Sequence, residues 1–373
     1  MYDTQDPYRM HPYDAPSDIK MFINSPSTYK RIKIDKNITP EDMRTTKAMT
    51  RGNEYDDYFC LPKDKFLDHY YVFAGRKPGD KVEAIVELIF EECLSDFCNP
   101  LSLNYLGLPL DKMDLTHKGL NARLTELITA YDYQGNWGMD ARLKGIDKNG
   151  GTYFSQLAEC GNKTMLDMET YNNLSAVINE LEADSIWGPT LKALRNPALR
   201  PPYIEVIFQS EGYCDRLAIK GKRDIIIINH QAKTKQVIDI KTAESYHRFI
   251  YNYFTYRYDI QGDMYTAIEK LDPKNEGYKI LPARFLVIYT GADTTERFHM
   301  FSMTLNDHLI AHNGGILGPI GKVEGWNPIL QEINWHKQHN NFKHRKVYFD
   351  NNNVFKMEDI LATQIVYKYD NKK

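Results

Sequence analysis

The chain has 373 residues, of which 42% are hydrophobic and 26% are charged, and its formal net charge is -3. This length suffices for one large domain or two smaller ones with a sizeable core, and the composition is typical of a soluble globular protein. The near-neutral charge argues against a surface that binds nucleic acid everywhere, while a local basic groove stays compatible with it. Because no apolar run could span a membrane and the polar first residues contain no apolar signal core, we expect a cytoplasmic protein without a membrane partner.

The cysteines predict neither a disulfide framework nor a zinc site. They are odd in number, widely spaced, and contain no Cys-x-x-Cys pair. We expect most of them to be buried thiols. They are Cys60, Cys93, Cys98, Cys160 and Cys214.

The first half of the chain is predicted to be mostly helical. Ser17 offers an N-cap for a short helix, which a Ser-Pro pair at residues 25 and 26 should end. A second helix is expected within residues 40–61, and apolar residues recur at helical spacing from 77 to about 195.

After residue 202 the pattern changes to β-structure. Residues 203–242 alternate, are rich in β-branched side chains and are interrupted by turn residues, which predicts a strand followed by a hairpin. One long helix is then expected over residues 244–271. Two buried strands and a last helix should follow, at residues 283–291, 297–305 and near 325–342.

This order of elements predicts an α/β protein whose N-terminal half is helical. The expected parts are a flexible arm (1–16), a mostly helical part packed on the core (17–195), the α/β core itself (196–345) and a C-terminal extension (346–373).

The hairpin carries the residues that indicate chemistry. Asp239 and Lys241 are two apart on one strand and therefore share a face. If the hairpin turns on Gln231-Ala232, Asp224 lies directly opposite Asp239, with Cβ atoms about 5 Å apart. Two facing carboxylates are unfavourable unless a positive group lies between them. Lys241 supplies one such charge, and a hard divalent cation such as Mg²⁺ would supply more.

That arrangement suits the hydrolysis of a phosphodiester. A metal ion polarises the phosphoryl oxygen and lowers the pKa of a bound water. The lysine would position that water or stabilise the charge that grows on the phosphoryl group. On the next helix Gln261 and Tyr265 are four residues apart and share a face, so Gln261 could orient Lys241 or a water and Tyr265 could contact a phosphate.

At this point the chain resembles a known family. An Asp, then Asp-x-Lys on the next strand, then Gln-x-x-x-Tyr on the next helix are similar to the PD-(D/E)XK nuclease superfamily. The likeness is strongest to the phage-type exonucleases related to RecE and lambda exonuclease. "YCDRLAIKGKRDIIII", "IDIKTA" and "YDIQGDMY" resemble their "G-x-x-x-K-G-x-x-D", "D-x-K-T" and "Y-x-x-Q-x-x-x-Y" motifs. "SDIKMFINSPSTYK" and "RGNEYDDYF" resemble two N-terminal motifs, and the histidine ligand of the second falls on Asp56.

The resemblance implies a restriction-endonuclease-like core with a mixed central sheet flanked by helices. It implies a Mg²⁺-dependent exonuclease, with Mn²⁺ as a substitute, that acts on duplex DNA ends in phage-type recombination or replication. Asp224, Asp239 and Asp56 would be the metal ligands, and Ser17 would lie near the DNA end. A single-strand annealing protein and a ring-like homo-oligomer are the implied partners, in the host cytoplasm if a phage encodes the chain. Related nucleases hold an iron–sulfur cluster with three cysteines beyond the lysine, and none follows Cys214 here, so no such cluster is expected.

Several other residues stay open between a structural role and a role in binding. Lys220, Lys222, Arg223 and Arg257 would either contact the DNA backbone or only solubilise and stabilise the fold. His336, His339 and His344 are interpreted as a polar helix surface rather than as a metal site. Two other functions compete: an endonuclease with the same metal site, and a non-catalytic DNA-binding protein that keeps the fold.

Overall fold

The structure is a computed structural model, and it describes residues 6–39, 42, 46–75, 77–98, 115, 120–291 and 297–354. The chain forms two compact units. Met1–Cys60 and Glu180–Lys373 form one, here called the sheet unit, and Leu61–Asn179 form the other, here called the helical unit. The first sixty residues therefore belong with the sheet and not with the helical part in which the prediction placed residues 17–60. No helix in the described part of the chain is both long enough and apolar enough to cross a membrane.

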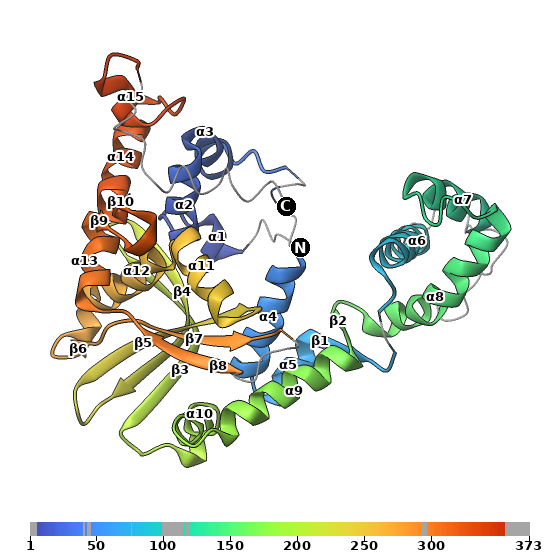
Figure 1. The fold of residues 1–373 in the computed structure, drawn as a ribbon, viewed down its shortest axis with the longest axis horizontal. Coiled ribbons are helices and arrows are strands. Elements are labelled where there is room, and N and C mark those ends of the chain that lie inside the picture. The colour runs from blue at the N-terminus through green and yellow to red at the C-terminus, as the bar shows by residue number, and fades with distance from the viewer. Residues whose placement is uncertain are drawn as a thin grey trace. The chain divides into compact units, whose positions relative to one another are not determined.

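The sheet unit is built on a mixed central sheet with the strand order β3-β4-β5-β7-β8 (Figure 1). The pair β5 and β7 is parallel, and the other neighbours along this order are antiparallel. A short strand, β6, also pairs with β5. Together with the flanking helices, this is the mixed α/β architecture that the sequence predicts. The strands are β3 (Ile204–Cys214), β4 (Ile219–Asn229), β5 (Thr234–Ala243), β6 (Lys279–Ile280), β7 (Arg284–Tyr289) and β8 (Phe298–Ser302).

The hairpin of β4 and β5 has the register that the sequence predicts. Its pairs run from Ile225↔Ile238 to Asn229↔Thr234. The connecting loop has four residues, 230–233, rather than the assumed two-residue turn. The Asn229 side chain accepts the backbone N–H of Ala232 at 2.8 Å, and Lys233 takes a left-handed φ of 52°, which closes the loop.

The predicted long helix is two helices, α11 (Tyr246–Thr255) and α12 (Tyr258–Leu271). They break at Arg257, which is buried and has a φ of 51°. Its guanidinium donates to both carboxylate oxygens of Asp259 at 2.9 Å and to the carbonyl oxygen of Glu324 at 3.1 Å. The prediction missed this break because neither Gly nor Pro marks it. The hydrogen bond from the Arg257 side chain to Glu324, which is distant in sequence, holds the backbone of Arg257 in this conformation instead.

Helix α2 (Pro16–Asn24) packs its apolar face on α12 and on α14 (Trp326–His339). Ile19 and Phe22 of α2 are buried with Trp326 in one cluster. Ser17 lies within the first turn of α2 and is exposed, so the predicted N-cap is wrong; the residue before the helix is Ala15, whose N–H donates to Asp18 at 2.8 Å. The predicted break at Ser25-Pro26 is confirmed, since α3 starts at Pro26.

Residues 6–16 lie against β4 rather than forming a separate arm. Asp14 makes an isolated parallel bridge with Ile219. The buried ammonium of Lys220 donates to the carbonyl oxygens of Tyr8 and His11. Lys220 is therefore a structural anchor, and it is not exposed to DNA.

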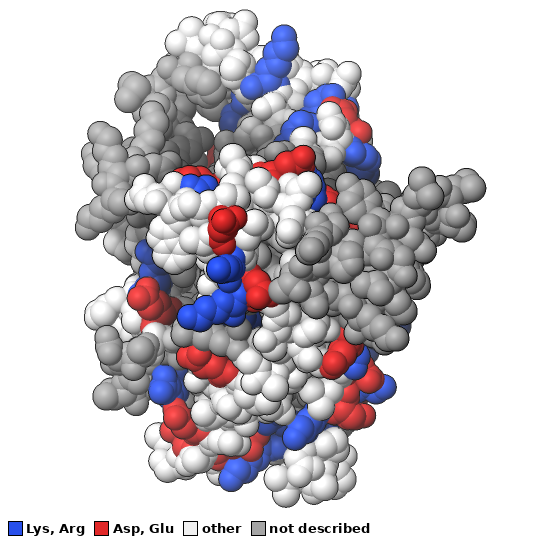
Figure 2. All heavy atoms as spheres, turned by 90° about the vertical axis from the view of Figure 1, so that its right-hand side faces the viewer, with Lys and Arg blue, Asp and Glu red and all other residues white. Residues whose placement is uncertain are grey.

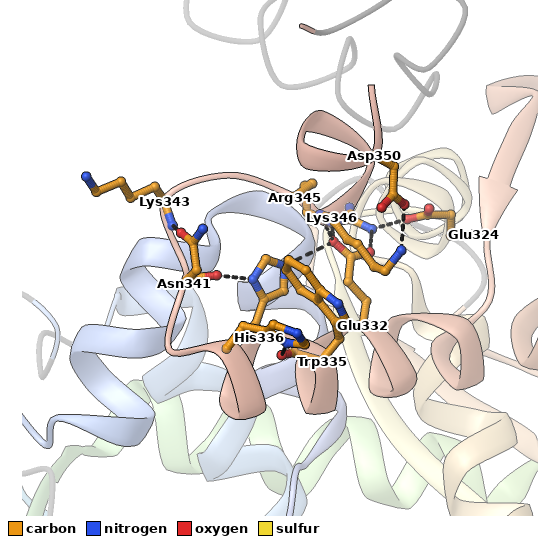
Figure 3. Close-up of polar contacts among 10 residues, drawn as sticks. Glu324, Glu332, Trp335, His336, Asn341, Lys343, Arg345, Lys346 and Asp350 are labelled. Atoms are coloured by element: carbon orange, nitrogen blue, oxygen red, sulfur yellow. Dashed lines mark hydrogen bonds and ion pairs between the residues drawn. The ribbon is translucent and has the colours of Figure 1, made fainter. Parts of the chain in front are cut away.

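A polar network fixes the C-terminal part of the sheet unit (Figure 3). The buried Arg345 pairs with Glu324 at 2.6 Å and with Glu332 at 2.7 Å. His336 is fully buried, and its Nδ1 bonds the carbonyl oxygen of Asn341, so the predicted polar surface is wrong for this histidine. The remaining elements are α1 (Pro7–Met10), α3 (Pro26–Tyr29), a π-helical turn (Lys30–Ile34), α4 (Lys47–Cys60), α10 (Gly188–Arg195), α13 (Leu305–Asn313), β9 (Gly314–Ile316), β10 (Lys322–Glu324), α15 (Lys346–Asp350) and 3₁₀ turns at Pro197–Leu199, Pro273–Asn275 and Gly318–Ile320.

The helical unit has its own core, in which Val86, Ile128 and Ile146 are fully buried. The strands β1 and β2 form a two-stranded parallel sheet that the sequence analysis did not predict. On the face shown in Figure 2, the described basic and acidic side chains are interspersed rather than gathered by sign. The elements are α5 (Lys63–His69), β1 (Tyr70–Phe73), α6 (Asp80–Cys98), α7 (Asn121–Ala130), α8 (Met139–Cys160) and β2 (Thr164–Asp167), and α9 (Met168–Ala183) continues into the sheet unit.

Candidate active site

The structure brings Asp224, Asp239 and Lys241 together where the hairpin opens. The pairing of β4 and β5 ends at Ile225↔Ile238, and the two aspartates are the next residues on each strand. Asp239 is buried, with 2% of its surface exposed, and its Oδ2 forms an ion pair with the Lys241 ammonium. Asp224 is half-buried, and its Oδ2 accepts the backbone N–H of Ile240 at 2.7 Å. The end of the hairpin thus carries two carboxylates and one ammonium.

The electrostatics of these three groups show that Lys241 alone does not stabilise both carboxylates in their ionised form. Burial and the neighbouring Asp239 carboxylate raise the pKa of Asp224 to about 8, against the opposing effects of Lys241 and the Ile240 N–H. Burial alone would lower the pKa of Lys241, but attraction to Asp239 and Asp224 raises it overall. Lys241 therefore stays protonated at neutral pH, and one lysine does not balance the two carboxylates.

Helix α4 directs Asp56 toward the same place. Gly52, Asp56 and Cys60 recur every four residues and so lie along one face of α4. A Cβ on Gly52 would lie 3.5 Å from Thr242 Oγ1, and the Cys60 thiol lies 3.9 Å from the carbonyl oxygen of Asp224. Asp56 stands between these two contacts. Burial and the Asp224 carboxylate raise the pKa of Asp56 well above its usual range, so Asp56 also favours its protonated form unless a cation is bound nearby.

Gln261 holds Asp239 rather than Lys241. Its side-chain amide donates to Asp239 Oδ1 at 2.9 Å and to the hydroxyl of Tyr265 at 3.0 Å. Tyr265 is buried, and burial with the nearby aspartates raises the pKa of its phenol. Its ring lies against Gly221, where an added Cβ would come within 2.6 Å of the ring carbons. Tyr265 therefore supports Gln261 from within the core.

Two residues near the site were not predicted from the sequence. Lys20 of α2 places its ammonium 5.4 Å from the centroid of the Tyr258 ring, and Lys241 lies 5.1 Å from the same centroid. Burial, with the like charge of Lys241, lowers the pKa of Lys20 to about 8. No local pattern marks Lys20, because the packing of α2 on α12 alone brings it here.

The second unpredicted residue is Gln209 on β3, which has a left-handed φ of 47°. By register it stands opposite Asp224, and pairing resumes on both sides of it. Its side-chain amide donates to Asp57 Oδ1 at 2.7 Å and so ties α4 to the edge of the sheet beside the aspartates. Non-glycine residues in this conformation are uncommon and often mark functional sites.

The predicted DNA contacts divide into two groups. Ser17 and Lys222 are exposed. Arg223 and Arg257 are buried with 4% of their surface exposed, and they pair with Glu269 at 3.3 Å and with Asp259, respectively. These two arginines therefore stabilise the fold and do not reach a DNA backbone.

The donor set suits a magnesium ion better than a metal that needs a complete protein cage. In the part of the chain described here, no three or more His, Cys, Asp or Glu side chains form a group that could hold a metal ion. Mg²⁺ commonly takes only one or two carboxylates and completes its coordination with water and substrate phosphate. Asp224 and Asp239 supply two carboxylates, and a cation between them would offset the repulsion that raises the pKa of Asp224. The residues present therefore fit this ion.

Comparisons with known proteins add little to this geometry. No family model matches the chain, and no curated protein matches it. Among solved structures, it is similar to the crystal structure of a protein from Eubacterium rectale that is provisionally named as an exonuclease. The identity is 11% and the TM-score 0.37, over 96% of this chain and 90% of that chain. A likeness of this size does not establish a shared activity.

Proposed function

We propose that this protein is a Mg²⁺-dependent deoxyribonuclease with a core of the PD-(D/E)XK type. The observation that carries the proposal is the position of Asp224 and Asp239 at the opening of one hairpin, with the Lys241 ammonium paired to Asp239. Two carboxylates and one protonated lysine in one partly enclosed place are the groups that metal-assisted phosphodiester hydrolysis requires.

Each residue has a defined part in this reaction. A bound Mg²⁺ would polarise the phosphoryl group and lower the pKa of a water molecule. Asp224 and Asp239 would hold the ion, and Asp56 faces the same place without forming a three-ligand group with them among the described residues. Lys241, which is protonated, stabilises the negative charge that grows on the phosphoryl oxygens and is not the base. Gln261 fixes the orientation of Asp239 through its Oδ1, and Tyr265 fixes Gln261.

Within this class we propose an exonuclease that acts on duplex DNA ends. The competing proposal is an endonuclease that uses the same metal site. The exonuclease, its role in phage-type recombination, a single-strand annealing partner and a ring-like oligomer follow from the resemblance of the motifs alone.

The test is digestion of an end-labelled linear duplex and of a covalently closed circle, each with and without Mg²⁺. The exonuclease should consume the linear duplex from its ends and leave the circle intact, and EDTA should stop the reaction. Asp239→Asn and Lys241→Met should lose about 10³-fold or more in rate, since each removes a main source of transition-state stabilisation. Glu205→Gln and Lys233→Met, which change exposed residues at the other end of the hairpin region, serve as matched controls.

Cleavage of the closed circle would contradict the proposed exonuclease and support the endonuclease instead. Full activity in purified Asp239→Asn or Lys241→Met would exclude this site. A folded protein that binds DNA and cleaves neither substrate would favour the non-catalytic DNA-binding protein.

A further inference from the structure

Lys20 forms no hydrogen bond or ion pair with a carboxylate of the described residues, although it lies next to a site rich in paired charges. Within the described part of the chain, its ammonium lies over the Tyr258 ring, 5.4 Å from the ring centroid. The residue is half-buried, and an unpaired ammonium in such a place loses hydration without compensation. Its lowered pKa is consistent with that cost. The Lys20 ammonium can therefore bind an anion that enters the site from solution.

The neighbouring carboxylates are already committed to other partners. Asp259 bonds the Arg257 guanidinium through both oxygens. Asp239 accepts a hydrogen bond from Gln261 through Oδ1 and forms an ion pair with Lys241 through Oδ2. Neither carboxylate can turn to Lys20 without giving up its present contact. The donors of the Lys20 ammonium therefore find no carboxylate acceptor within this cluster.

The place of Lys20 is fixed by rigid packing. The preceding residue, Ile19, and Phe22 are fully buried against α12 and α14. Helix α12 begins at Tyr258 and also carries Gln261, so Lys20, Tyr258 and the aspartate site are held by one packed pair of helices. The ammonium groups of Lys20 and Lys241 both lie over the Tyr258 ring, at 5.4 Å and 5.1 Å from its centroid. Two cations fixed around one ring, each near the aspartate site, can bind the same stretch of a sugar–phosphate backbone.

The charge of the cluster fits the same ligand. Ionised Asp56, Asp224 and Asp239 together with protonated Lys20 and Lys241 leave one net negative charge. A divalent cation would turn this into one net positive charge, which a single phosphodiester group neutralises. Without Lys20 the loaded site would be neutral and would attract the DNA backbone less.

We propose that Lys20 is a substrate-binding residue whose ammonium contacts a non-bridging oxygen of the internal phosphodiester that lies beside Lys241. This inference rests on the proposed function, and it names one further contact to the same substrate. The contact is to the sugar–phosphate backbone, so it is independent of base sequence.

The test compares Lys20→Met, which keeps the apolar stem and removes the charge, with Lys20→Arg, which keeps the charge. Lys270→Met is the matched control, because Lys270 is exposed and lies twelve residues along α12 from Tyr258, about 18 Å away. Binding of a short fluorescent duplex is measured by anisotropy, both in EDTA and with Ca²⁺ in place of Mg²⁺, over a range of salt concentrations and with 5′-phosphate and 5′-hydroxyl ends. Thermal unfolding is measured on the same samples, and cleavage with Mg²⁺ gives kcat and KM.

Lys20→Met should weaken DNA binding by about 10- to 100-fold and lower the slope of log K against log salt by about 0.9, the share of one phosphate contact. The loss should be equal for the two kinds of end, Lys20→Arg should retain most of the affinity, and the melting temperature should change little. This binding result does not depend on cleavage. If no protein, wild type included, cleaved DNA, only the proposed nuclease activity would be refuted, and the contact of Lys20 with DNA would remain supported. Unchanged binding in Lys20→Met, a loss confined to 5′-phosphorylated ends, or a loss that follows a fall in melting temperature would each overturn the inference.

Discussion

The Asp224 carboxylate accepts the backbone N–H of Ile240 at 2.7 Å, at the point where the ladder between β4 and β5 has ended. A side chain thus takes the place of a strand partner and stays fixed as the two strands separate. The same bond directs the carboxylate toward β5, where Asp239 and Lys241 lie. One oxygen of Asp224 is therefore structural, and the carboxylate as a whole lies next to that of Asp239, which raises its pKa.

The stability of the metal-free protein should depend on pH through Asp224. The folded-state pKa of Asp224, about 8, lies above the value near 3.9 of an unfolded chain. The folded protein thus holds a proton that the unfolded chain loses, so this group's contribution to stability is full below about pH 4 and is lost as the pH rises toward 8. Melting temperatures without metal should fall over this range, and Asp224→Asn should flatten the fall. An identical pH dependence in the variant would contradict the account.

The same proton predicts the pH dependence of metal binding. A divalent cation must displace it, so the apparent affinity for Mg²⁺ should rise about tenfold per pH unit below pH 8 and level off above it. Calorimetry in two buffers of different ionisation enthalpy should detect close to one released proton at pH 7. An affinity that does not change between pH 6 and pH 8 would show that Asp224 binds the ion without losing a proton, or does not bind it.

Gln261→Ala should weaken metal binding and cleavage by about 10- to 100-fold, as is usual when a residue that orients a ligand is removed. The substitution leaves Asp239 Oδ1 without the amide that fixes it. Tyr265→Phe removes only the hydroxyl that Gln261 donates to and should have a smaller effect. The control is Gln331→Ala, on the exposed face of α14. Equal losses in Gln331→Ala would mean that the assay reports general instability.

Gly221→Ala should act through Tyr265. The new Cβ would lie 2.6 Å from two carbons of the buried ring and 3.1 Å from Ile268 Cδ1. The ring must shift, which costs about 1–3 kcal/mol and moves its hydroxyl from Gln261. Urea unfolding should report the lost stability, and the cleavage rate should fall as well. Gly138→Ala, where an added Cβ meets no atom within 4 Å, should change neither; unaltered stability in Gly221→Ala would contradict the packing described.

The sequence predicted the hairpin register because the compact polar turn leaves little freedom in the pairing of the two strands. It therefore also predicted which carboxylates come together. It could not predict the break at Arg257, since the left-handed backbone there depends on a bond to Glu324, 67 residues away in sequence. The placement of Lys20 and the burial of Arg223 and Arg257 depend likewise on tertiary packing. Helix α13 did carry a local signal, the Thr304 and Asp307 capping box, which the strand prediction over residues 297–305 obscured.

Arg257→Ala tests the corrected role of that residue. It would leave the fully buried Asp259 carboxylate without its partner, and breaking a buried pair in this way costs about 3–5 kcal/mol. Arg248→Ala, which changes an exposed arginine of α11, is the control for stability. If Arg257→Ala kept its stability and lost only DNA binding, Arg257 would be a DNA contact after all.

The central claim is that a divalent cation binds between the carboxylates of Asp224 and Asp239. The most direct measurement is the binding of Mn²⁺, followed by electron paramagnetic resonance, to the wild type, Asp224→Asn and Asp239→Asn. The account predicts a bound ion in the wild type and a loss of affinity of at least about tenfold in each variant, which remains folded. Mn²⁺ binding of equal affinity in all three proteins would contradict it.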